Sequence, residues 1–321
     1  MNSVSVVIPF YNRDKFLKRT LLSIWRQTYR PIELILVDNL SDDHSLEICK
    51  AFSSEYNQDD FVIKILNAPR RGASIARNVG LSQATGRWIS FFDSDDEMSA
   101  DFLEKMVGVL RGTDLDLSVA ATKMIFPDNT EKVRSVFYTG NVTDQILAGM
   151  ISTQSCVLKT AFARHIGGWN EQLTTWDDWE FGVRILLARP RLKWMEGEVF
   201  HRIYQHGDSI TGTSMSGNLP AKLHAIETVE KECGEDACRE AARLALAARR
   251  ILLAAQIAKE KEIAHAARLR QSTIGSQQGR FAKAALQVLY HYTAHGGKGG
   301  WYIFRIFLRA LHLLFPVRYR L

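Results

Sequence analysis

The chain has 321 residues, of which 46% are hydrophobic and 24% are charged. This composition excludes a disordered, collagen-like or disulfide-scaffold protein and is typical of one large or two modest globular domains. The formal net charge of +6 is divided unevenly, because residues 241–321 hold 14 Lys and Arg against Glu260 and Glu262, a net +12, so the first 240 residues carry −6.

The first hundred residues alternate strand and helix signals. Short apolar runs rich in β-branched residues predict strands at 4–9, 32–37, 61–66 and 88–92. Helical periodicity predicts helices at 14–27, 41–52 and 73–84. Repeated β-α-β units with such apolar strands indicate a mostly parallel sheet covered on both faces. Ligands bind such sheets beyond the carboxyl ends of the strands.

The rest of the chain has a mixed and then a helical pattern. A helix is predicted at 101–111 and strands near 117–126 and 133–138, followed by turns and short elements. After Pro220 the chain is Ala-rich, basic and helical. We therefore expect divisions at about 100 and about 217.

An acidic run follows the fourth predicted strand. Asp93 and Asp95 lie one residue apart, and Asp96 comes next. Two carboxylates at one strand end can face the same cavity, and hard oxygen ligands suit Mg²⁺ or Mn²⁺ shared with phosphate oxygens. The alternative is a cluster at a helix N-terminus, where acids are stabilised by the helix dipole. The run by itself favours neither interpretation.

A second acidic group lies between aromatic residues. Trp176, Asp177, Asp178 and Trp179 follow one another, and Glu180 comes next. This pattern suits a general base beside a sugar-stacking surface. It equally suits the acidic first turn of a helix, and both interpretations can hold together.

Histidine and arginine residues add candidate ligands. His201 and His206 enclose the sequence RIYQ, and a His near a cation site can bind the cation, although a lone His is more often an ordinary hydrogen-bonded residue. Arg70, Arg71 and Arg77 precede the acidic run and could hold phosphate through bidentate contacts, with solvated surface charge as the competing interpretation.

Taken together, the motifs form a recognisable pattern. Four segments in this order resemble the family-two glycosyltransferases, namely SVVIPFYN, ELILVDNLSDD, RRGASIARNVGLSQATGRWISFFDSDD and GGWNEQLTTWDDWEFGVRI. That family consists of inverting, nucleotide-sugar-dependent enzymes with the glycosyltransferase A-type fold, an α/β fold with a Rossmann-like, mostly parallel sheet flanked by helices. The resemblance covers about residues 1–210. It implies a nucleotide-sugar-binding half at 1–100 and an acceptor-binding half of the same catalytic domain at 101–217, followed by a basic C-terminal α-helical extension at 218–321.

The resemblance implies roles in donor binding. Pro9, Tyr11 and Asn12 match the loop that lines the nucleotide pocket. Asp38 matches the acid that hydrogen-bonds the base, usually uracil, although the family's usual VDDGS motif reads Val-Asp-Asn-Leu-Ser here. Arg77 lies in a stretch that resembles the family's RN motif and is expected to support the nucleotide site.

The acidic residues match the family's metal and base positions. Asp93, beside Ser94, would face the ribose and diphosphate, and Asp95, with Asp93, would hold Mg²⁺ or Mn²⁺. Asp178 matches the general base, and His206 resembles a His that helps hold the metal or the diphosphate. The acceptor-site candidates are Trp176, Asp177 and Trp179.

The implied reaction moves a sugar from a nucleoside-diphosphate sugar, here expected to be a UDP-sugar, to a hydroxyl of a glycan or lipid-linked acceptor. A single displacement with a carboxylate base inverts the anomeric carbon, and the sequence shows no nucleophilic Ser or Cys motif that would favour a covalent intermediate. Two alternatives are a nucleotidyltransferase, which would need a Gly-rich loop where the chain reads FYNRDKF, and a non-catalytic sugar-binding or scaffold subunit.

The basic tail predicts a membrane-surface helix at 301–317. One helical face is predicted to carry an apolar stripe formed by Trp301, Phe304, Leu308, Leu311 and Phe315 and widened by Ile303, Phe307 and Leu314. The opposite side carries Arg305, Arg309 and His312. We expect this helix to lie on an anionic membrane surface, because basic residues add affinity there. Packing against the catalytic domain or against a second subunit is the alternative.

The expected location follows from the same sequence features. The start MNSVSVVIPFYN has no basic n-region, and no run of about 18 apolar residues is free of charge. The four cysteines are scattered without a CxxC pair, which is typical of a reducing compartment, at Cys49, Cys156, Cys233 and Cys238. We expect a cytoplasmic protein, peripheral on the inner face of the cell membrane, that binds no nucleic acid. The sequence is compatible with an oligomer.

Overall fold

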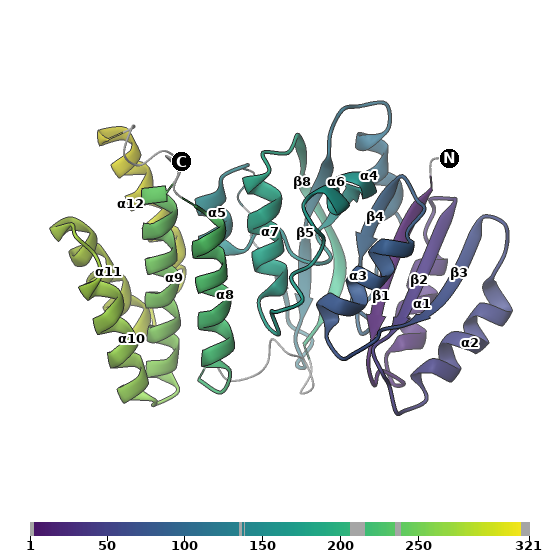
Figure 1. The fold of residues 1–321 in the computed structure, drawn as a ribbon, viewed down its shortest axis with the longest axis horizontal. Coiled ribbons are helices and arrows are strands. Elements are labelled where there is room, and N and C mark those ends of the chain that lie inside the picture. Colours follow the sequence, from purple (N-terminus) through teal and green to yellow (C-terminus); the bar gives the residue numbers. More distant parts are fainter. Residues whose placement is uncertain (1–2, 135–136, 138, 206–215, 235–238, 316–321) are drawn as a thin grey trace. The chain divides into compact units, whose positions relative to one another are not determined.

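The first half of the central sheet is parallel. The structure is a computed structural model that describes residues 3–134, 137, 139–205, 216–234 and 239–315. In it, β1 pairs with β2 and β4, and β2 pairs with β3, all in parallel (Figure 1). These strands are β1 (Val4–Phe10), β2 (Ile32–Asp38), β3 (Phe61–Asn67) and β4 (Trp88–Phe91). All four were expected from the sequence, because each contains a short apolar run; β1, β2 and β4 are buried along their whole length, whereas β3 is partly exposed.

Helices cover both faces of these strands. The side chains of Val4, Val6 and Ile8 share one buried cluster with α1 (Leu17–Trp25), α2 (Ser45–Tyr56) and α4 (Phe102–Leu110). On the opposite face α3 (Ala73–Gln83) approaches β1 so closely that a Cβ at Gly80 would lie 2.3 Å from a methyl of Val7. Glycine at position 80 therefore sets how near α3 lies to the sheet.

The second half of the sheet is mixed. Its strands are β5 (Leu117–Ile125), β6 (Glu131–Val133), β7 (Cys156–Lys159) and β8 (Leu192–Tyr204). β7 runs antiparallel to β4 and β5, β6 runs antiparallel to β5, and β8 runs parallel to β5 with two register shifts. The helices of this part are α5 (Val142–Ala148), α6 (Thr160–His165) and α7 (Asp177–Leu187). The predicted α/β fold with a mostly parallel central sheet is confirmed.

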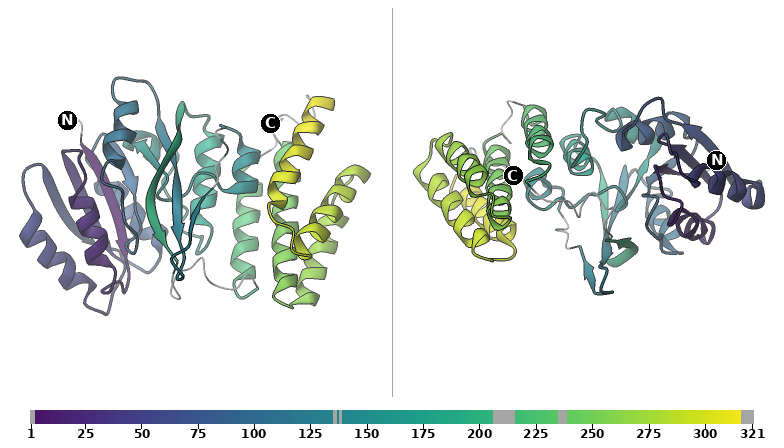
Figure 2. Two further views of the ribbon diagram at one scale, coloured as in Figure 1. Left: turned by 180° about the vertical axis from the view of Figure 1, so that it is seen from behind. Right: turned by 90° about the horizontal axis from the view of Figure 1, so that it is seen from below.

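The C-terminal region is helical, as predicted. It contains α8 (Leu219–Glu232), α9 (Arg239–Lys259), α10 (Ile263–Gly275), α11 (Arg280–Ala294) and α12 (Gly300–Leu314). α9 packs against the four other helices of this region and against α5 (Figures 1 and 2). Small buried side chains on α9, such as Ala245 and Ala248, let these helices come close.

Two compact units make up the chain. The first contains Met1–Tyr138, Ile151–Phe181 and Ala188–Ser209, and the second contains Thr139–Met150, Gly182–Leu187 and Ile210–Leu321. α5 and the last part of α7 therefore belong with the C-terminal helices. The functional halves expected at 1–100 and 101–217 stay predictions.

The centre of the stripe predicted to face a membrane packs inside the C-terminal unit instead. Phe304 and Leu308 are buried, and α12 contacts α5, α9 and α11. Arg305, expected to face lipid, donates two hydrogen bonds of 2.6 and 3.1 Å to the carboxylate of Asp144 on α5. The expectation of membrane contact was therefore wrong for Phe304, Leu308 and Arg305, because a buried carboxylate that the sequence did not point to binds the guanidinium. For the rest of 301–317 it stays a prediction. Within the described ranges, no helix is both long and apolar enough to cross a bilayer.

Candidate active site

The loops that follow β1 and β2 are tied together by side chains. β1 and β2 are in register, so Phe10 lies opposite Asp38 at their carboxyl ends. Beyond them the backbone N–H of Asn12 donates to Ser41 Oγ at 3.2 Å, and its side-chain Oδ1 accepts the N–H of Asp42 at 3.0 Å. Asn12 has a φ of 51°, a left-handed conformation that Asn adopts more readily than most residues. The predicted nucleotide loop is therefore held in one conformation.

The predicted base-binding acid lies at the end of β2. Asp38 is buried and accepts the backbone N–H of Ser41 through Oδ1 at 3.0 Å. Asn39, which replaces an acid of the usual motif, accepts the N–H of Gly72 at 3.0 Å and so anchors the start of α3. Tyr11, after β1, has the guanidinium of Arg71 over its ring at 4.2 Å. Pro9, Tyr11, Asn12 and Asp38 thus all lie at or just beyond the ends of β1 and β2.

Arg77 joins the two acidic groups that the sequence singled out. Its Nη2 donates to Asp93 Oδ1 at 2.9 Å and its Nη1 donates to Asp177 Oδ2 at 2.7 Å, while its guanidinium lies 4.4 Å from the Trp169 ring centroid. Burial works to lower the pKa of Arg77, but the charges of Asp177 and Asp93 outweigh burial and raise it. A permanently charged, planar fork is the group that can bind two carboxylates at once.

The acidic loop after β4 is held by Gln154, which no sequence motif indicated. Nε2 of Gln154 donates to Asp93 Oδ2 at 2.8 Å and to Asp96 Oδ2 at 2.6 Å. Asp96 also accepts the N–H of Tyr204 at 2.7 Å, and Ser94 is buried beside it. Burial, with the charges of Asp95 and Asp93, raises the pKa of Asp96 to about 8. No motif surrounds Gln154, so only the fold reveals it.

Asp95 is the member of the loop that meets the N-terminal segment. Nε of Arg13 lies 3.3 Å from Asp95 Oδ2, and the backbone oxygen of Asp95 accepts a hydrogen bond from Arg19. The Asp95 side chain keeps 16% of its surface exposed and that of Asp93 keeps 36%. Both predicted metal ligands therefore keep carboxylate surface that a ligand can reach.

Asp177 and Asp178 open α7. Asp177 accepts hydrogen bonds from Arg77 and, at 3.2 Å, from Ser74 Oγ. Asp178 is half-buried and accepts the N–H of Trp179 at 2.7 Å. Burial comes first in raising the pKa of Asp178; Asp177 and Asp93 raise it further, while Arg134 and Arg77 oppose the rise. The helix-start interpretation of this segment is therefore confirmed, and the role of Asp178 as a general base stays a prediction.

The two acceptor-site tryptophans differ in exposure. Trp179 is only 2% exposed, whereas Trp176 is half-buried and has a φ of 56°. The expectation that both rings offer a stacking surface is therefore wrong for Trp179, because its place on the first turn of α7 turns the ring into the core. Trp176 keeps that candidate role.

The predicted histidines contribute no metal ligand among the described residues. His206 lies outside the described residues. His201 is buried among the rings of Phe92, Phe102 and Phe200, and burial lowers its pKa to about 3. Across the described ranges, no group of three His, Cys, Asp or Glu side chains is placed to hold a metal ion. The donor set still fits Mg²⁺ or Mn²⁺, which bind through one or two carboxylates plus substrate phosphates and water.

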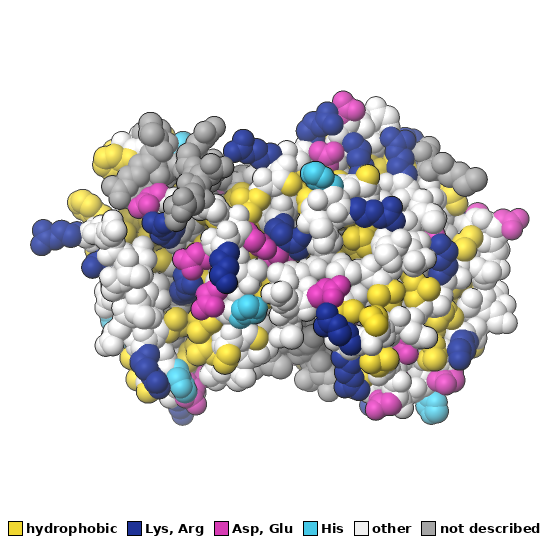
Figure 3. All heavy atoms as spheres, in the orientation of Figure 1, with side chains coloured by type: hydrophobic (Ala, Val, Ile, Leu, Met, Phe, Trp, Pro, Cys, Tyr) yellow, Lys and Arg dark blue, Asp and Glu magenta, His cyan; other side chains and the backbone are white. Residues whose placement is uncertain are grey.

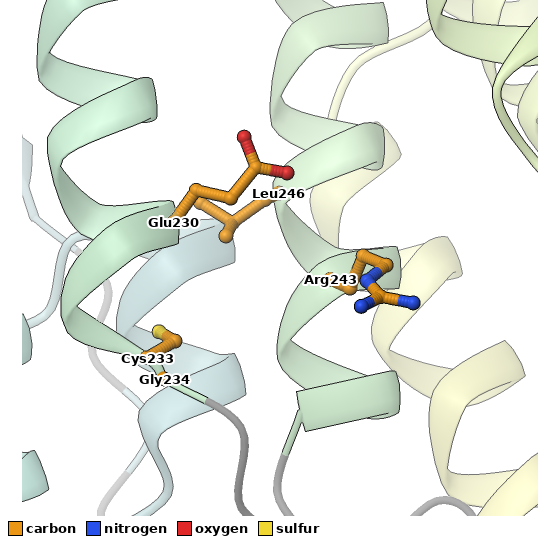
Figure 4. Close-up of a pocket in the computed structure, with 5 residues that line it drawn as sticks. All are labelled: Glu230, Cys233, Gly234, Arg243 and Leu246. Atoms are coloured by element: carbon orange, nitrogen blue, oxygen red, sulfur yellow. The ribbon is translucent and has the colours of Figure 1, made fainter.

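A separate hollow lies in the C-terminal unit. It measures about 280 Å³ and is lined by Glu230, Cys233, Gly234, Arg243 and Leu246 (Figure 4). The carboxylate of Glu230 is already paired with Arg250 at 2.8 Å. The hollow shares no residue with the Arg77 network, so the carboxylates at the sheet edge remain the candidate active site.

The fold and the position of the carboxylates define a class of protein. A parallel β3-β2-β1-β4 sheet with an acidic loop after β4 is the arrangement of the glycosyltransferase A-type fold, and the S. aureus TarS fragment 1–349 in complex with UDP-GlcNAc superposes with a TM-score of 0.67. That match covers 93% of this chain and 89% of the other at 18% identity. The chain belongs to glycosyl transferase family 2, because that family's model matches residues 5–166.

Relatives in sequence agree with this assignment. The glycosyltransferase GlyG of Streptococcus pneumoniae is 38% identical over 117 residues, which are 36% of this chain and 38% of the relative. The minor teichoic acid biosynthesis protein GgaA of Bacillus subtilis is 29% identical over 223 residues, which are 65% of this chain and 49% of the relative. The chain thus spans less than half the length of these curated relatives.

Proposed function

We propose that the chain transfers a sugar from a UDP-sugar to a hydroxyl of a glycan or lipid-linked acceptor, with inversion at the anomeric carbon. Membership of the family supports glycosyl transfer, and the TarS complex with UDP-GlcNAc supports a uridine diphosphate donor for a protein of this fold. The relative GgaA, named for teichoic acid biosynthesis, supports a cell-surface polymer as the acceptor.

The observation that carries the proposal is the bridge that Arg77 makes between Asp93 and Asp177. Asp93 belongs to the loop proposed to face the donor, and Asp177 precedes the proposed base. One rigid cation therefore fixes the donor side of the site relative to the acceptor side. Fixed placement of two reactants is a large part of catalysis for a reaction between two bound molecules.

Asp178 is the proposed general base. A carboxylate with a raised pKa takes a proton more readily than an ordinary one, which suits a general base. The oxygen of the acceptor hydroxyl forms the new bond to the anomeric carbon while the bond from that carbon to the diphosphate oxygen breaks. The hydroxyl proton goes to Asp178, and the electron pair of the broken bond stays on the diphosphate. The acceptor enters opposite the leaving group, so the product has the inverted configuration.

Asp95 and Asp93 are the residues proposed to hold a divalent metal, with the remaining ligands supplied by the diphosphate and water. A bound Mg²⁺ or Mn²⁺ neutralises negative charge that develops on the leaving diphosphate. The residues of the chain bind and orient: Tyr11 and Asp38 are proposed to hold the uridine, and Arg77 keeps Asp93 aimed at the donor.

The Asp178→Asn variant tests the proposal. We expect release of UDP with an accepted acceptor to fall at least about 100-fold, the contribution of a general base, while the dissociation constant of the UDP-sugar stays within about twofold. Asp114→Asn, which removes an 85% exposed carboxylate before β5, is the matched control and should keep full activity. An equal loss of donor affinity in Asp178→Asn would make Asp178 a binding residue, and unchanged turnover would refute the proposed base.

The donor is found by thermal-shift measurements on the full chain with Mn²⁺ and a panel of nucleotide sugars. A matched donor binds the folded state and stabilises it. The stabilisation grows with the logarithm of the ratio of the donor concentration to the dissociation constant. Stabilisation by a GDP-sugar in place of UDP-sugars would contradict the uridine assignment.

A further inference from the structure

The helix α12 is apolar on two sides. Its inner side, with Phe304 and Leu308, is buried within the C-terminal unit. Arg305 and Arg309 lie along one narrow strip, where Arg305 is hydrogen-bonded to Asp144 and Arg309 lies 3.9 Å from the same carboxylate. A helix on a protein surface normally turns polar residues outward, and α12 does not.

The outer side of α12 carries large apolar side chains. Positions three, four and seven apart share one face of a helix, so these residues form a continuous strip. We call them the outer face of α12, and their exposed fractions are 49% for Tyr302, 45% for Ile303, 54% for Ile306, 80% for Leu313 and 70% for Leu314. On the neighbouring helix α11, Phe281 and Val288 are also exposed, at 84% and 64%. An exposed apolar strip of this kind is typical of an interaction site.

The segment of sequence that contains α11 and α12 carries charge of one sign. The chain has no Asp or Glu after Glu262, whereas residues 263–321 contain nine Lys and Arg. Lys298, in the turn before α12, and Arg280, next to Phe281, are both exposed. In the view of Figure 3, apolar and basic side chains reach the surface over α11 and the last turns of α12, with acidic side chains also in view nearby.

This positive charge favours an anionic lipid surface over a second copy of the chain as the partner of the outer face. A twofold interface between two copies would set the same cationic patch against itself, because each partner presents the same residues. An anionic lipid surface accepts apolar side chains below its headgroups and attracts Lys and Arg at the headgroup level. We propose that the outer face of α12, flanked by Lys298 and Arg280, docks the protein on an anionic membrane surface. Of the stripe predicted from the sequence, this face keeps Ile303 and Leu314, whereas Phe304 and Leu308 are buried.

Vesicle co-sedimentation of the full chain tests the proposal. Vesicles of phosphatidylcholine alone are compared with vesicles that contain about a third phosphatidylglycerol. We expect the protein to sediment with the anionic vesicles and to be released by 0.5 M salt, because the Debye length falls to about 4 Å there. Failure of the unmodified chain to bind either kind of vesicle would overturn the proposal.

The double variant Ile306→Ser/Leu313→Ser tests the face itself. We expect its partition coefficient on anionic vesicles to fall at least about tenfold, because each lost methylene weakens insertion. Val62→Ser/Val133→Ser makes similar changes at two exposed apolar positions of the other unit, 41% and 44% exposed, and should bind like the unmodified chain. Equal binding by both double variants would refute the outer face as the docking site.

Two further readouts separate the competing occupants. Lys298→Gln/Arg280→Gln should lose most of its preference for anionic vesicles, and an unchanged preference would contradict the charge argument. Light scattering reports the oligomeric state: a dimer that Ile306→Ser/Leu313→Ser abolishes, with no binding to vesicles, would assign the face to a second copy. Because these measurements need no donor or acceptor, they are independent of the proposed transferase activity.

Discussion

Nε of Arg13 lies 3.3 Å from Oδ2 of Asp95, so the carboxylate proposed to hold a metal is already paired with a cation of the chain. Nη1 of Arg13 donates to the backbone oxygen of Asn12 at 3.2 Å, which fixes the guanidinium in the loop after β1. A divalent ion at Asp95 therefore has to compete with Arg13 for the same oxygen.

Arg13→Gln tests this competition. We expect the variant, in the presence of UDP, to bind Mn²⁺ about two- to fivefold more tightly, because a partly exposed ion pair is worth up to about 1 kcal/mol. Electron paramagnetic resonance of free Mn²⁺ during titration measures the affinity. Lys15→Gln removes one exposed positive charge from the same segment and should change the affinity by less than about twofold. Weaker Mn²⁺ binding by Arg13→Gln would show instead that Arg13 binds the diphosphate.

Substitution of Arg77 tests the bridge between the two acidic groups. Arg77→Met leaves Asp93 and Asp177 without their common cation, and we expect the free energy of unfolding to fall by about 3 kcal/mol, as when one partner of a buried ion pair is removed. Arg77→Lys keeps the charge but not the planar fork, so it should recover only part of the loss. Urea unfolding measures both variants. Full stability and full donor affinity in Arg77→Lys would show that a positive charge at this position is sufficient and that the planar guanidinium is not needed.

The parallel half of the sheet could be predicted from the sequence because its strands are short apolar runs, of which β1, β2 and β4 are buried on both faces. β1 and β2 each end one residue later than expected, at Phe10 and Asp38. The mixed half was harder. β7 has only four residues, and β8 shows no continuous apolar run or regular alternation, with a burial pattern that changes along its length. Their pairing depends on contacts between segments far apart in the chain, which periodicity cannot show.

The acidic side chains of the candidate site could be predicted, but their partners could not. Asp93, Asp95 and Asp178 stood out because acids follow a strand or open a helix. Gln154 has no neighbouring motif, and its contacts with Asp93 and Asp96 join residues about 60 positions apart. The partner of Arg305, Asp144, is 161 positions away. The sequence alone could not reveal this pair, so Arg305 was expected to face a membrane.

His201 should make folding stability depend on pH. Burial lowers its pKa in the folded protein to about 3, whereas an unfolded histidine has a pKa near 6.5. Between about pH 6.5 and pH 3 the unfolded chain binds a proton that the folded protein does not, so stability falls as the pH is lowered through this window. Above pH 6.5 both states are neutral at His201, and its contribution is constant.

His201→Asn should remove that dependence. Asn does not titrate and tolerates the φ of 66° found at this position. We expect the slope of unfolding free energy against pH, near pH 5, to drop by up to about 1.4 kcal/mol per pH unit relative to the unmodified chain. Urea unfolding between pH 4.5 and pH 7.5 measures the slope. His165→Asn, at an exposed position, is the control and should leave the slope unchanged; an unchanged slope in His201→Asn would place the pH dependence elsewhere.

The pair formed by Asp144 and Arg305 should stabilise the C-terminal unit only as a pair. Asp144 is buried and also accepts a hydrogen bond from Thr139 Oγ1 at 2.8 Å. Asp144→Asn leaves a mostly buried guanidinium without its counter-charge, and we expect a loss of about 3 kcal/mol in unfolding free energy. Arg305→Met should cost a similar amount, because it leaves the buried carboxylate without its main partner.

The double variant Asp144→Leu/Arg305→Met decides whether the two charges act together. Apolar replacements of both partners avoid any buried unpaired charge, so we expect the double variant to be more stable than either single variant and within about 1 kcal/mol of the unmodified chain. Arg309→Gln, whose side chain is 48% exposed and 3.9 Å from Asp144, serves as the control and should cost less than about 1 kcal/mol. If the losses in unfolding free energy of the two single variants simply added in the double variant, Asp144 and Arg305 would stabilise the unit separately. The hydrogen-bonded pair would then not be what holds α12 against α5.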